Sequence, residues 1–286
     1  MVKLHNEVFD SRQTMRGSAF EFHHYLDTEP PCVPFHEHPF YEIYFFLSGI
    51  VTYNIEGRSY QLRPGDILLT GSRDIHRPDI LPGKPYERYV IWLTEDFLHR
   101  FNGQGGDLST CFRGTQEKRY HLIRPDVSAL AQLKAQCELM AALKDEHSFG
   151  SDSLFYANLV AFLVYLNRAY FNTPLSVRQD IRENETINLL LDYINEHLAE
   201  PLSLDILSAR FFLSKFYLNN KFRQYTGLTI YQYIIKKRLT VARNMLRGGT
   251  PVMNACMACG FNDYSNFLKA FKREFNCAPH EYIPAG

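Results

Sequence analysis

The sequence has little that would direct the chain into or across a membrane. Its first residues, MVKLHNEVFDSR, contain no apolar stretch followed by a cleavage pattern, so we expect no export signal. The most apolar segment, 154–171, is interrupted by two asparagines and Arg168. This interruption favours a buried or interfacial helix over a membrane span. We therefore expect a cytoplasmic protein without a membrane partner.

Cysteine is scarce and scattered. The chain has six cysteines in 286 residues, which predicts reduced thiols and no disulfide framework. Cys256 and Cys259 form a CxxC pair, but no second pair or nearby histidine completes a zinc site. We expect both to be small core residues of a helix.

The sequence also lacks recognisable catalytic motifs, and its positive and negative charges are equal in number. The sequence shows no nucleophile elbow and no phosphate-binding glycine loop, so little in it favours an enzyme. The formal net charge is +0, but the segment from Pro201 to the end holds 12 Lys/Arg and 4 Asp/Glu, a balance of +8. The remainder then carries −8. A basic end on an acidic remainder indicates a polyanionic partner for that end alone.

Short apolar runs separated by turn residues occupy residues 20–98. Four runs predict β-strands: YEIYFFLSG, IVTYNIEGRSYQL, GDILLTG and YERYVIWL. Turn pairs stand at Ser48-Gly49, Glu56-Gly57 and Pro64-Gly65. Because no helical pattern intervenes, strands at this spacing favour a small barrel or a sandwich.

The spacing of apolar residues changes after Pro125. Residues 127–143 and 152–171 each predict an amphipathic helix, and 172–184 predict a linker. The second helix is apolar on more than one face, which indicates a subunit interface, with burial inside one subunit as the alternative. The pattern is helical from 185 onward. We expect an α+β multidomain chain with a sensing barrel (1–115), a helical dimerisation region and linker (116–183), and an all-α domain (184–286).

The most informative feature is an internal repeat near the C-terminus. The segment LNNKFRQYTGLTIYQYI (218–234) aligns with FLKAFKREFNCAPHEYI (267–283). Matched pairs are Leu218 and Phe267, Phe222 and Phe271, and Gly227 and Asn276. Glycine and asparagine both adopt the left-handed conformation that ends a helix. A short apolar helix and a tight turn precede each copy, so each copy predicts a helix-turn-helix unit.

Each second helix of these units places its polar side chains on one face. With the matched apolar pairs inward, the outward residues are Lys215, Phe216, Asn219, Asn220 and Arg223 in the first copy, and Ser265, Asn266, Lys269, Lys272 and Arg273 in the second. None is a carboxylate. Amide, ammonium and aromatic groups of this kind contact base edges in the major groove. Arg223, Lys272 and Arg273, nearer the helix ends, are better placed for phosphates.

Residues 202–283 resemble the DNA-binding domain of AraC/XylS-type regulators, and GFNDYSNFLKAFKREFNCAPHEYI is close to that family's signature. The resemblance implies base contacts from Lys215, Phe216, Asn219, Asn220, Ser265, Asn266 and Lys269. It also implies double-stranded DNA as partner, a homodimer joined by helices after the barrel, and RNA polymerase as a partner of an activator. Asn220 and Lys269 stand where the family often has arginine, and Asn276 stands where glycine is usual, so base preference stays open.

A second constellation lies in the expected barrel. His36 and His38 stand at i, i+2 on a predicted strand, followed by Glu42 and, past a turn, His76. The pattern resembles the two cupin motifs, and AraC-type regulators often carry such a barrel. Three imidazoles and one carboxylate suit a divalent transition metal. The same side chains, with Tyr44 and Trp92, suit a small polar ligand such as a sugar. Binding of neither is the third possibility, so no cofactor is certain.

The sequence thus predicts a sequence-specific DNA-binding transcription regulator controlled by a small molecule, a sugar or related metabolite, in a cupin-like barrel. Two alternatives stay open. One is a metal-dependent cupin enzyme fused to a DNA-binding tail. The other is constitutive DNA binding, with the barrel used only for dimerisation.

Overall fold

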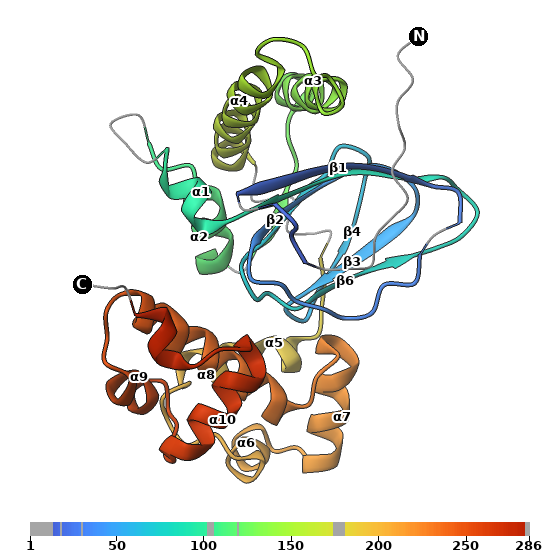
Figure 1. Ribbon diagram of the computed structural model, residues 1–286. Coiled ribbons are helices and arrows are strands. Elements are labelled where there is room, and N and C mark those ends of the chain that lie inside the picture. The colour runs from blue at the N-terminus through green and yellow to red at the C-terminus, as the bar shows by residue number, and fades with distance from the viewer. Residues whose placement is uncertain are drawn as a thin grey trace. The chain divides into compact units, whose positions relative to one another are not determined.

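Strands and helices segregate along the chain, as the computed structural model shows (Figure 1). The structure describes residues 14–17, 19–29, 31–101, 106–118, 120–173 and 181–283. The chain divides into an N-terminal unit, Met1–Ile55 with Ser59–Arg182, and a C-terminal unit, Glu183–Gly286 with Glu56–Arg58. Most of the linker predicted over 172–184 lies outside the described residues.

The strands of the N-terminal unit form two sheets that face each other as the walls of a barrel (Figure 1). One sheet has the order β1-β7-β2-β5-β8 and the other β6-β3-β4-β9. The strands span Phe20–Asp27 (β1), Tyr41–Ser48 (β2), Val51–Ile55 (β3), Arg58–Gln61 (β4), Ile67–Thr70 (β5), His76–Ile80 (β6), Tyr86–Leu93 (β7), Leu122–Ile123 (β8) and Ile181–Glu183 (β9). Strands β1, β6, β8 and β9 lie outside the four runs that the sequence pattern predicts, and β9 lies within the predicted linker.

Strand β2 is buried on both faces. Its side chains alternate, so Ile43 and Phe45 pack outward against helices, while Tyr44 and Phe46 pack into the barrel interior. This double burial explains why β2 is a nearly unbroken apolar run. The barrel wall therefore separates two hydrophobic cores.

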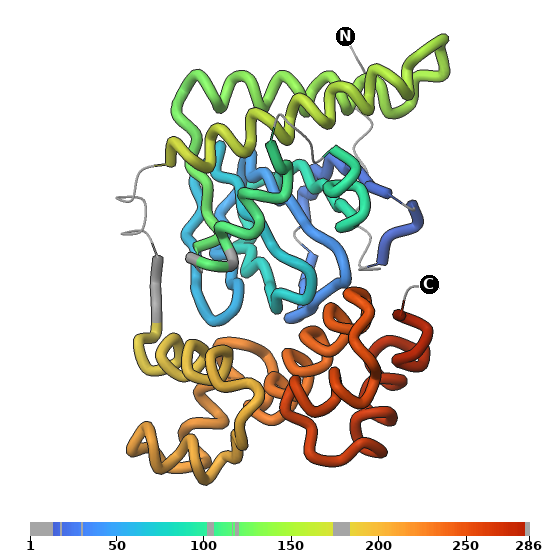
Figure 2. Tube along the Cα trace, turned by 90° about the vertical axis from the view of Figure 1, so that its left-hand side faces the viewer, coloured from blue at the N-terminus to red at the C-terminus, as the bar shows by residue number. Residues whose placement is uncertain are grey.

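Helices cover the outer face of the five-stranded sheet. Helices α3 (Val127–Leu143) and α4 (Ser151–Asn172) form an antiparallel hairpin along it, as Figure 2 shows. The shorter α1 (Glu95–His99) and α2 (Thr110–Lys118) complete this layer. The helical region expected to be separate from the barrel therefore belongs to the same unit.

Helix α4 is a core helix. By length and composition it is the one helix among the described residues that could cross a membrane. Its inner side, however, includes Leu159, Phe162 and Leu163, all fully buried in the cluster between helices and sheet. Its outer side leaves Leu154 59% exposed and Phe171 67% exposed.

The C-terminal unit contains two helix-turn-helix pairs joined by a long helix. Its elements are α5 (Glu185–Glu196), α6 (Leu204–Phe211), α7 (Lys215–Thr226), α8 (Ile230–Arg247), α9 (Val252–Ala258), α10 (Tyr264–Phe275) and the 3-10 turn η2 (Pro279–Tyr282). The first pair is α6 and α7, the second is α9 and α10, and α8 connects them (Figure 1). This arrangement confirms the fold class expected from the repeat.

The two pairs share local geometry. In the turns, the backbone nitrogen of Leu213 donates to the oxygen of Ser208 at 3.2 Å, and that of Phe261 donates to Cys256 at 3.2 Å. Helices α7 and α10 end at Gly227 (φ 75°) and Asn276 (φ 57°), both left-handed, as the sequence match predicts.

The inward face of each second helix is also as predicted. Leu218, Phe222, Phe267 and Phe271 are fully buried. Cys256 and Cys259 are buried in the core of the second pair, and all six cysteines are free.

Replacing Phe271 by alanine should lower the free energy of unfolding by about 3–5 kcal/mol, because the truncation leaves a cavity among buried aromatic rings. Thermal and urea denaturation of the full chain, followed by circular dichroism, measure the loss. The neighbouring exposed position supplies the control: Lys272→Ala should change stability by no more than about 0.5 kcal/mol. Equal effects of both substitutions would mean that the inward face of α10 has been misassigned.

Candidate DNA interface and barrel site

The exposed face of α7 carries most of the residues that the sequence assigns to DNA. Lys215, Phe216, Asn220 and Arg223 are exposed, and Phe216 is 79% exposed although it is aromatic. Ser214 caps the helix, its hydroxyl accepting from the backbone nitrogen of Tyr217 at 3.2 Å. Because the cap fixes the first turn of α7, it also fixes the direction of the exposed side chains that follow.

Asn219 departs from the expected pattern. It is half-buried, and its side-chain oxygen accepts from the backbone nitrogen of Ile230 at 3.1 Å. Ile230 begins α8, where the first backbone N–H groups have no partner within the helix. Asn219 therefore links α7 to the connecting helix and is less exposed than the helical pattern predicts. Its contact with DNA stays a prediction.

The exposed face of α10 carries all the residues that the sequence predicts to lie there. All five expected residues are exposed: Ser265, Asn266, Lys269, Lys272 and Arg273. Asp263 caps the helix by accepting from the backbone nitrogen of Asn266 at 2.6 Å. Lys272 and Arg273 lie in the last turn, where the negative end of the helix dipole stabilises positive charge.

Sequence reasoning missed an acidic neighbour of the first exposed face. Asp205, near the start of α6, forms an ion pair with Lys215. Their side chains are 74% and 53% exposed, respectively, so water screens the pair and its stabilising effect is small. Another hydrogen-bond acceptor can therefore compete with Asp205 for the Lys215 ammonium group.

The second candidate site lies at one end of the barrel interior. One ring nitrogen from each of His36, His38 and His76 falls within 4.8 Å of the others. The carboxylate of Glu42 is close by, 3.4 Å from Nε2 of His38 and 3.9 Å from Nε2 of His76. The structure thus brings together all four residues that the cupin-like pattern singled out.

The local backbone differs from the prediction at the first two histidines. His36 and His38 lie in the extended segment before β2, not on a strand of the main sheets. His36 is nevertheless held against the start of β6, because it exchanges backbone hydrogen bonds with His76 at 3.1 and 2.9 Å.

The carboxylate of Glu42 is fixed by two further side chains. The hydroxyl of Tyr53 donates to it at 3.1 Å, and Nε1 of Trp92 donates to it at 2.7 Å. Burial alone would raise the pKa of Glu42, but its contact with His38 at 3.4 Å and the neighbouring imidazoles hold this pKa below its ordinary value. Glu42 is therefore a carboxylate at neutral pH.

Burial lowers the pKa of two of the histidines, whereas it would raise that of a carboxyl group. It lowers the pKa of His36 and, more strongly, that of His76, because desolvation disfavours the charged imidazolium. Both rings are therefore neutral at physiological pH.

The barrel interior beside this cluster is nearly filled by its own side chains. The hydroxyls of Tyr44 and Tyr86 hydrogen-bond at 2.6 Å, and buried Arg88 forms an ion pair with Asp27. The remaining cavity, which His36, Glu42, Tyr44 and Trp92 help to line, has a volume of about 30 Å³. Tyr86 and Arg88 are residues of this site that sequence reasoning missed.

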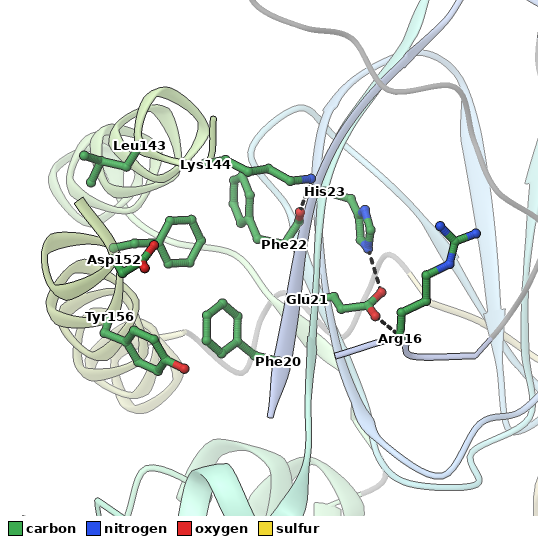
Figure 3. Close-up of a pocket in the computed structure, with 10 residues that line it drawn as sticks. Arg16, Phe20, Glu21, Phe22, His23, Leu143, Lys144, Asp152 and Tyr156 are labelled. Atoms are coloured by element: carbon green, nitrogen blue, oxygen red, sulfur yellow. Dashed lines mark hydrogen bonds and ion pairs between the residues drawn. The ribbon is translucent and has the colours of Figure 1, made fainter. Parts of the chain in front are cut away.

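A larger hollow lies outside the barrel, between β1 and the α3–α4 hairpin (Figure 3). Its volume is about 490 Å³. Phe20, Phe155 and Tyr156 supply aromatic side chains to its lining, and Lys144 and Asp152 line it as well. Figure 3 labels Phe20, Tyr156, Lys144 and Asp152 around the hollow. The sequence gives no indication of this groove, because its walls come from segments more than a hundred residues apart.

Two family models match the chain in the same two regions. Residues 22–159 match a family described as an AraC-like ligand binding domain. Residues 207–284 match a helix-turn-helix domain. The first match covers most of the barrel with its helical layer, and the second covers the helix pairs.

Named relatives match across both regions. The chain is 25% identical over 250 residues to the HTH-type transcriptional activator RhaS of Klebsiella pneumoniae (strain 342), covering 87% of this chain and 86% of that protein. RhaS of Escherichia coli (strain SE11) is 26% identical over the same shares. Both are named as activators, which favours the regulator over a cupin enzyme with a DNA-binding tail.

Matches among solved structures include apo ToxT, carrying a substitution of one lysine by alanine, from Vibrio cholerae strain SCE256. It is 15% identical, with 93% of this chain and 97% of that chain covered and a TM-score of 0.40. An AraC-type regulator from Chromobacterium violaceum is 26% identical over 34% of this chain and 88% of that chain, with a TM-score of 0.32.

The paired helix-turn-helix units, the barrel before them and the matches across both regions lead to one assignment. The chain belongs to the AraC family of transcription regulators, with an N-terminal ligand-binding domain and a C-terminal DNA-binding domain.

Proposed function

We propose that this regulator binds a specific sequence of double-stranded DNA through the exposed faces of α7 and α10, and that a ligand of the N-terminal unit controls this binding. The observation that carries the proposal is the composition of the two faces. Nine exposed side chains on two matched helices are amide, hydroxyl, cationic or aromatic, and none is a carboxylate. Such faces complement the base edges and phosphates of a duplex.

The exposed residues divide between base and phosphate contacts by their place on the helices. Residues near the helix starts are assigned to bases: Lys215, Phe216, Asn220, Ser265, Asn266 and Lys269. Residues nearer the helix ends are assigned to phosphates: Arg223, Lys272 and Arg273. Two linked helices of this kind enter successive segments of the major groove, about 34 Å apart.

The ligand of the N-terminal unit is proposed to be a small molecule. A sugar or related metabolite in the barrel stays a prediction. Because the barrel cavity measures about 30 Å³, a sugar would require Tyr44, Tyr86 or Arg88 to move. The groove beside β1, at about 490 Å³, lies within the usual range of small-molecule sites.

The protein is further proposed to activate transcription, because the relatives are named as activators. RNA polymerase is then a partner, and the cytoplasm is the proposed location.

A second copy of the chain is the proposed partner of the α3–α4 hairpin. Apolar side chains remain on its outer surface, with Val127 87% exposed, Leu139 49% and Leu154 59%. Exposed apolar side chains on a helical layer are typical of a subunit interface. A homodimer would bring four recognition helices to the DNA.

Replacing Lys269 by alanine should cost about 1–3 kcal/mol of discrimination at one base position, because a base-edge contact is lost. The measurement compares affinities for a duplex selected from a random library by the full-length protein and for its single-base variants. Asn220→Ala should act in the same way at a different position. A uniform loss over all duplexes would show that these residues contact the backbone instead.

Replacing Lys272 by alanine should weaken binding to all duplexes about equally and should lower the dependence of affinity on salt by about one counterion. Fluorescence anisotropy over a range of KCl concentrations gives both quantities. Lys84→Ala removes an exposed lysine from a loop of the N-terminal unit, outside the α3–α4 hairpin, and serves as the control. A loss confined to one sequence would contradict the phosphate assignment.

The double substitution Leu139→Glu and Leu154→Glu should convert the dimer to a monomer, because four added charges cannot be buried in an apolar interface. Sedimentation velocity measures the change. Leu81→Glu, at an equally exposed leucine (60%) outside the hairpin, should leave the dimer intact. A dimer that survives the double substitution would place the interface elsewhere.

A further inference from the structure

The groove between β1 and the α3–α4 hairpin contains a cluster of aromatic rings. The rings of Phe20 and Phe155 stack, with centroids 5.5 Å apart and an angle of 15° between their planes. The ring of Tyr156 meets that of Phe20 edge-on, at 5.0 Å and 88°. Tyr156 is 43% exposed, although covering an aromatic ring is favourable. The groove therefore offers an apolar surface that a ligand can bury.

One half of the groove is engaged by its own side chains. Phe20 extends from β1 towards the hairpin, whereas Glu21, His23 and Arg16 lie on the other side of the strand (Figure 3). The carboxylate of Glu21 accepts from the backbone nitrogen of Gly17 at 2.7 Å and lies 3.2 Å from Nε2 of His23. Because these polar groups bind one another, the hairpin side is the half that suits a ligand.

Two opposite charges line the hairpin side. Lys144 directly follows α3, and Asp152 lies in the first turn of α4, so the short connection between the helices brings both to the same end of the hairpin. Nζ of Lys144 donates to the backbone oxygen of Phe22 at 2.8 Å, which anchors the ammonium group beside β1. An ammonium group has three donors, so this bond leaves it able to bind a ligand carboxylate as well.

Asp152 supplies the negative charge. Its carboxylate is exposed and has no hydrogen-bond or ion-pair partner among the residues that the structure describes. Lys144 and Asp152 thus line the same groove without pairing with each other. A carboxylate next to aromatic rings is typical of a site for an amine, because it supplies the opposite charge and the ring faces attract cations.

The combination of features selects the class of ligand. Asp152 would repel a purely anionic ligand, and Lys144 would repel a purely cationic one. A zwitterion can pair its carboxylate with Lys144 and its ammonium group with Asp152. The rest of such a ligand lies on the aromatic rings and must be apolar. The groove volume of about 490 Å³ accommodates a molecule of this size.

We propose that this groove binds a free α-amino acid with an apolar or aromatic side chain, and that this amino acid is the ligand sensed by the N-terminal unit. The binding site follows from the groove itself, and only its control over DNA binding rests on the proposed function.

A ligand in the groove contacts both layers of the N-terminal unit. It binds the sheet through Phe20 and the hairpin through Lys144, Asp152 and Tyr156. The outer surface of the same hairpin is the proposed dimer interface, and it includes Leu154, two residues from Asp152. Binding that fixes the hairpin against β1 therefore also acts on the interface. A difference between the free and bound states of this kind is what control by a ligand requires.

The test titrates the full-length protein with L-phenylalanine in a calorimeter. We expect one molecule bound per chain and a higher thermal unfolding temperature. Two analogues separate the charges: 3-phenylpropionate lacks the ammonium group, and 2-phenylethylamine lacks the carboxylate. Each should bind at least tenfold more weakly than phenylalanine, because a charge-assisted hydrogen bond is lost.

Substitutions then assign each charge to its partner. Asp152→Asn should weaken phenylalanine binding at least tenfold and should not weaken binding of 3-phenylpropionate, which has no ammonium group. Lys144→Met should weaken phenylalanine binding and should not weaken binding of 2-phenylethylamine. Asp145→Asn is the matched control, because Asp145 is an exposed carboxylate next to Lys144 in the chain and does not line the groove. Asp152 is also exposed, so its replacement removes no core contact.

The same ligand tests the sensing role. Affinity for the library-selected duplex should change at least fivefold between the free protein and the protein saturated with phenylalanine, about 1 kcal/mol of coupling. The change should be lost in Asp152→Asn and retained in Asp145→Asn at the same phenylalanine concentration.

Each outcome decides a separate claim. Absence of phenylalanine binding, or equal affinity for phenylalanine and both analogues, overturns the amino-acid site. Binding that is unchanged in Asp152→Asn overturns its location in the groove. Stoichiometric binding with equal DNA affinity in both states overturns the sensing role. A protein that binds phenylalanine and binds no DNA in either state overturns the proposed function and leaves the amino-acid site supported.

Discussion

Burial of one apolar stripe on α7 and one on α10 holds the DNA-binding face in position. Leu218 and Phe222, and Phe267 and Phe271, have no exposure to solvent. A helix rotated by even a third of a turn would bring these rings into water and turn its polar side chains inward. The hydrophobic penalty for such a rotation is several kcal/mol per helix at about 25 cal/mol per Å². The direction of the polar face is thus a consequence of packing on the opposite side.

The barrel site depends on a different constraint, which is the matching of donors with acceptors. Most of the barrel interior is satisfied internally: Tyr44 pairs with Tyr86, and Arg88 pairs with Asp27. The histidine cluster is the exception, because Nε2 of His38 and Nε2 of His76 are buried beside the carboxylate of Glu42 at 3.4 and 3.9 Å, outside the hydrogen-bond network of the interior.

The sequence predicts the helix-turn-helix pairs well and the barrel less well. Helical periodicity, a repeated motif and left-handed caps at Gly227 and Asn276 agree with one another, so the error is confined to single side chains. The partial burial of Asn219 was not predicted, because periodicity gives the face of a residue but not its hydrogen-bond partner, which is the backbone of Ile230. Strands β1 and β6 were missed because both contain histidines and charged residues within short segments, which hides the alternation. The pairing of Arg88 with Asp27 joins positions 61 residues apart, and no local pattern reveals it.

Because β2 is buried on both faces, substitutions in one hydrophobic core affect the packing of the other. A substitution at Phe45 disturbs the helical layer, and one at Tyr44, its neighbour in the chain, disturbs the interior that adjoins the histidines. Because the two side chains share one backbone, a shift of the strand in response to either change displaces side chains on both faces of the sheet. Relatives that acquire a new ligand in the barrel must therefore adjust the helices that lie behind the sheet, so ligand preference and subunit contacts are expected to diverge together during evolution.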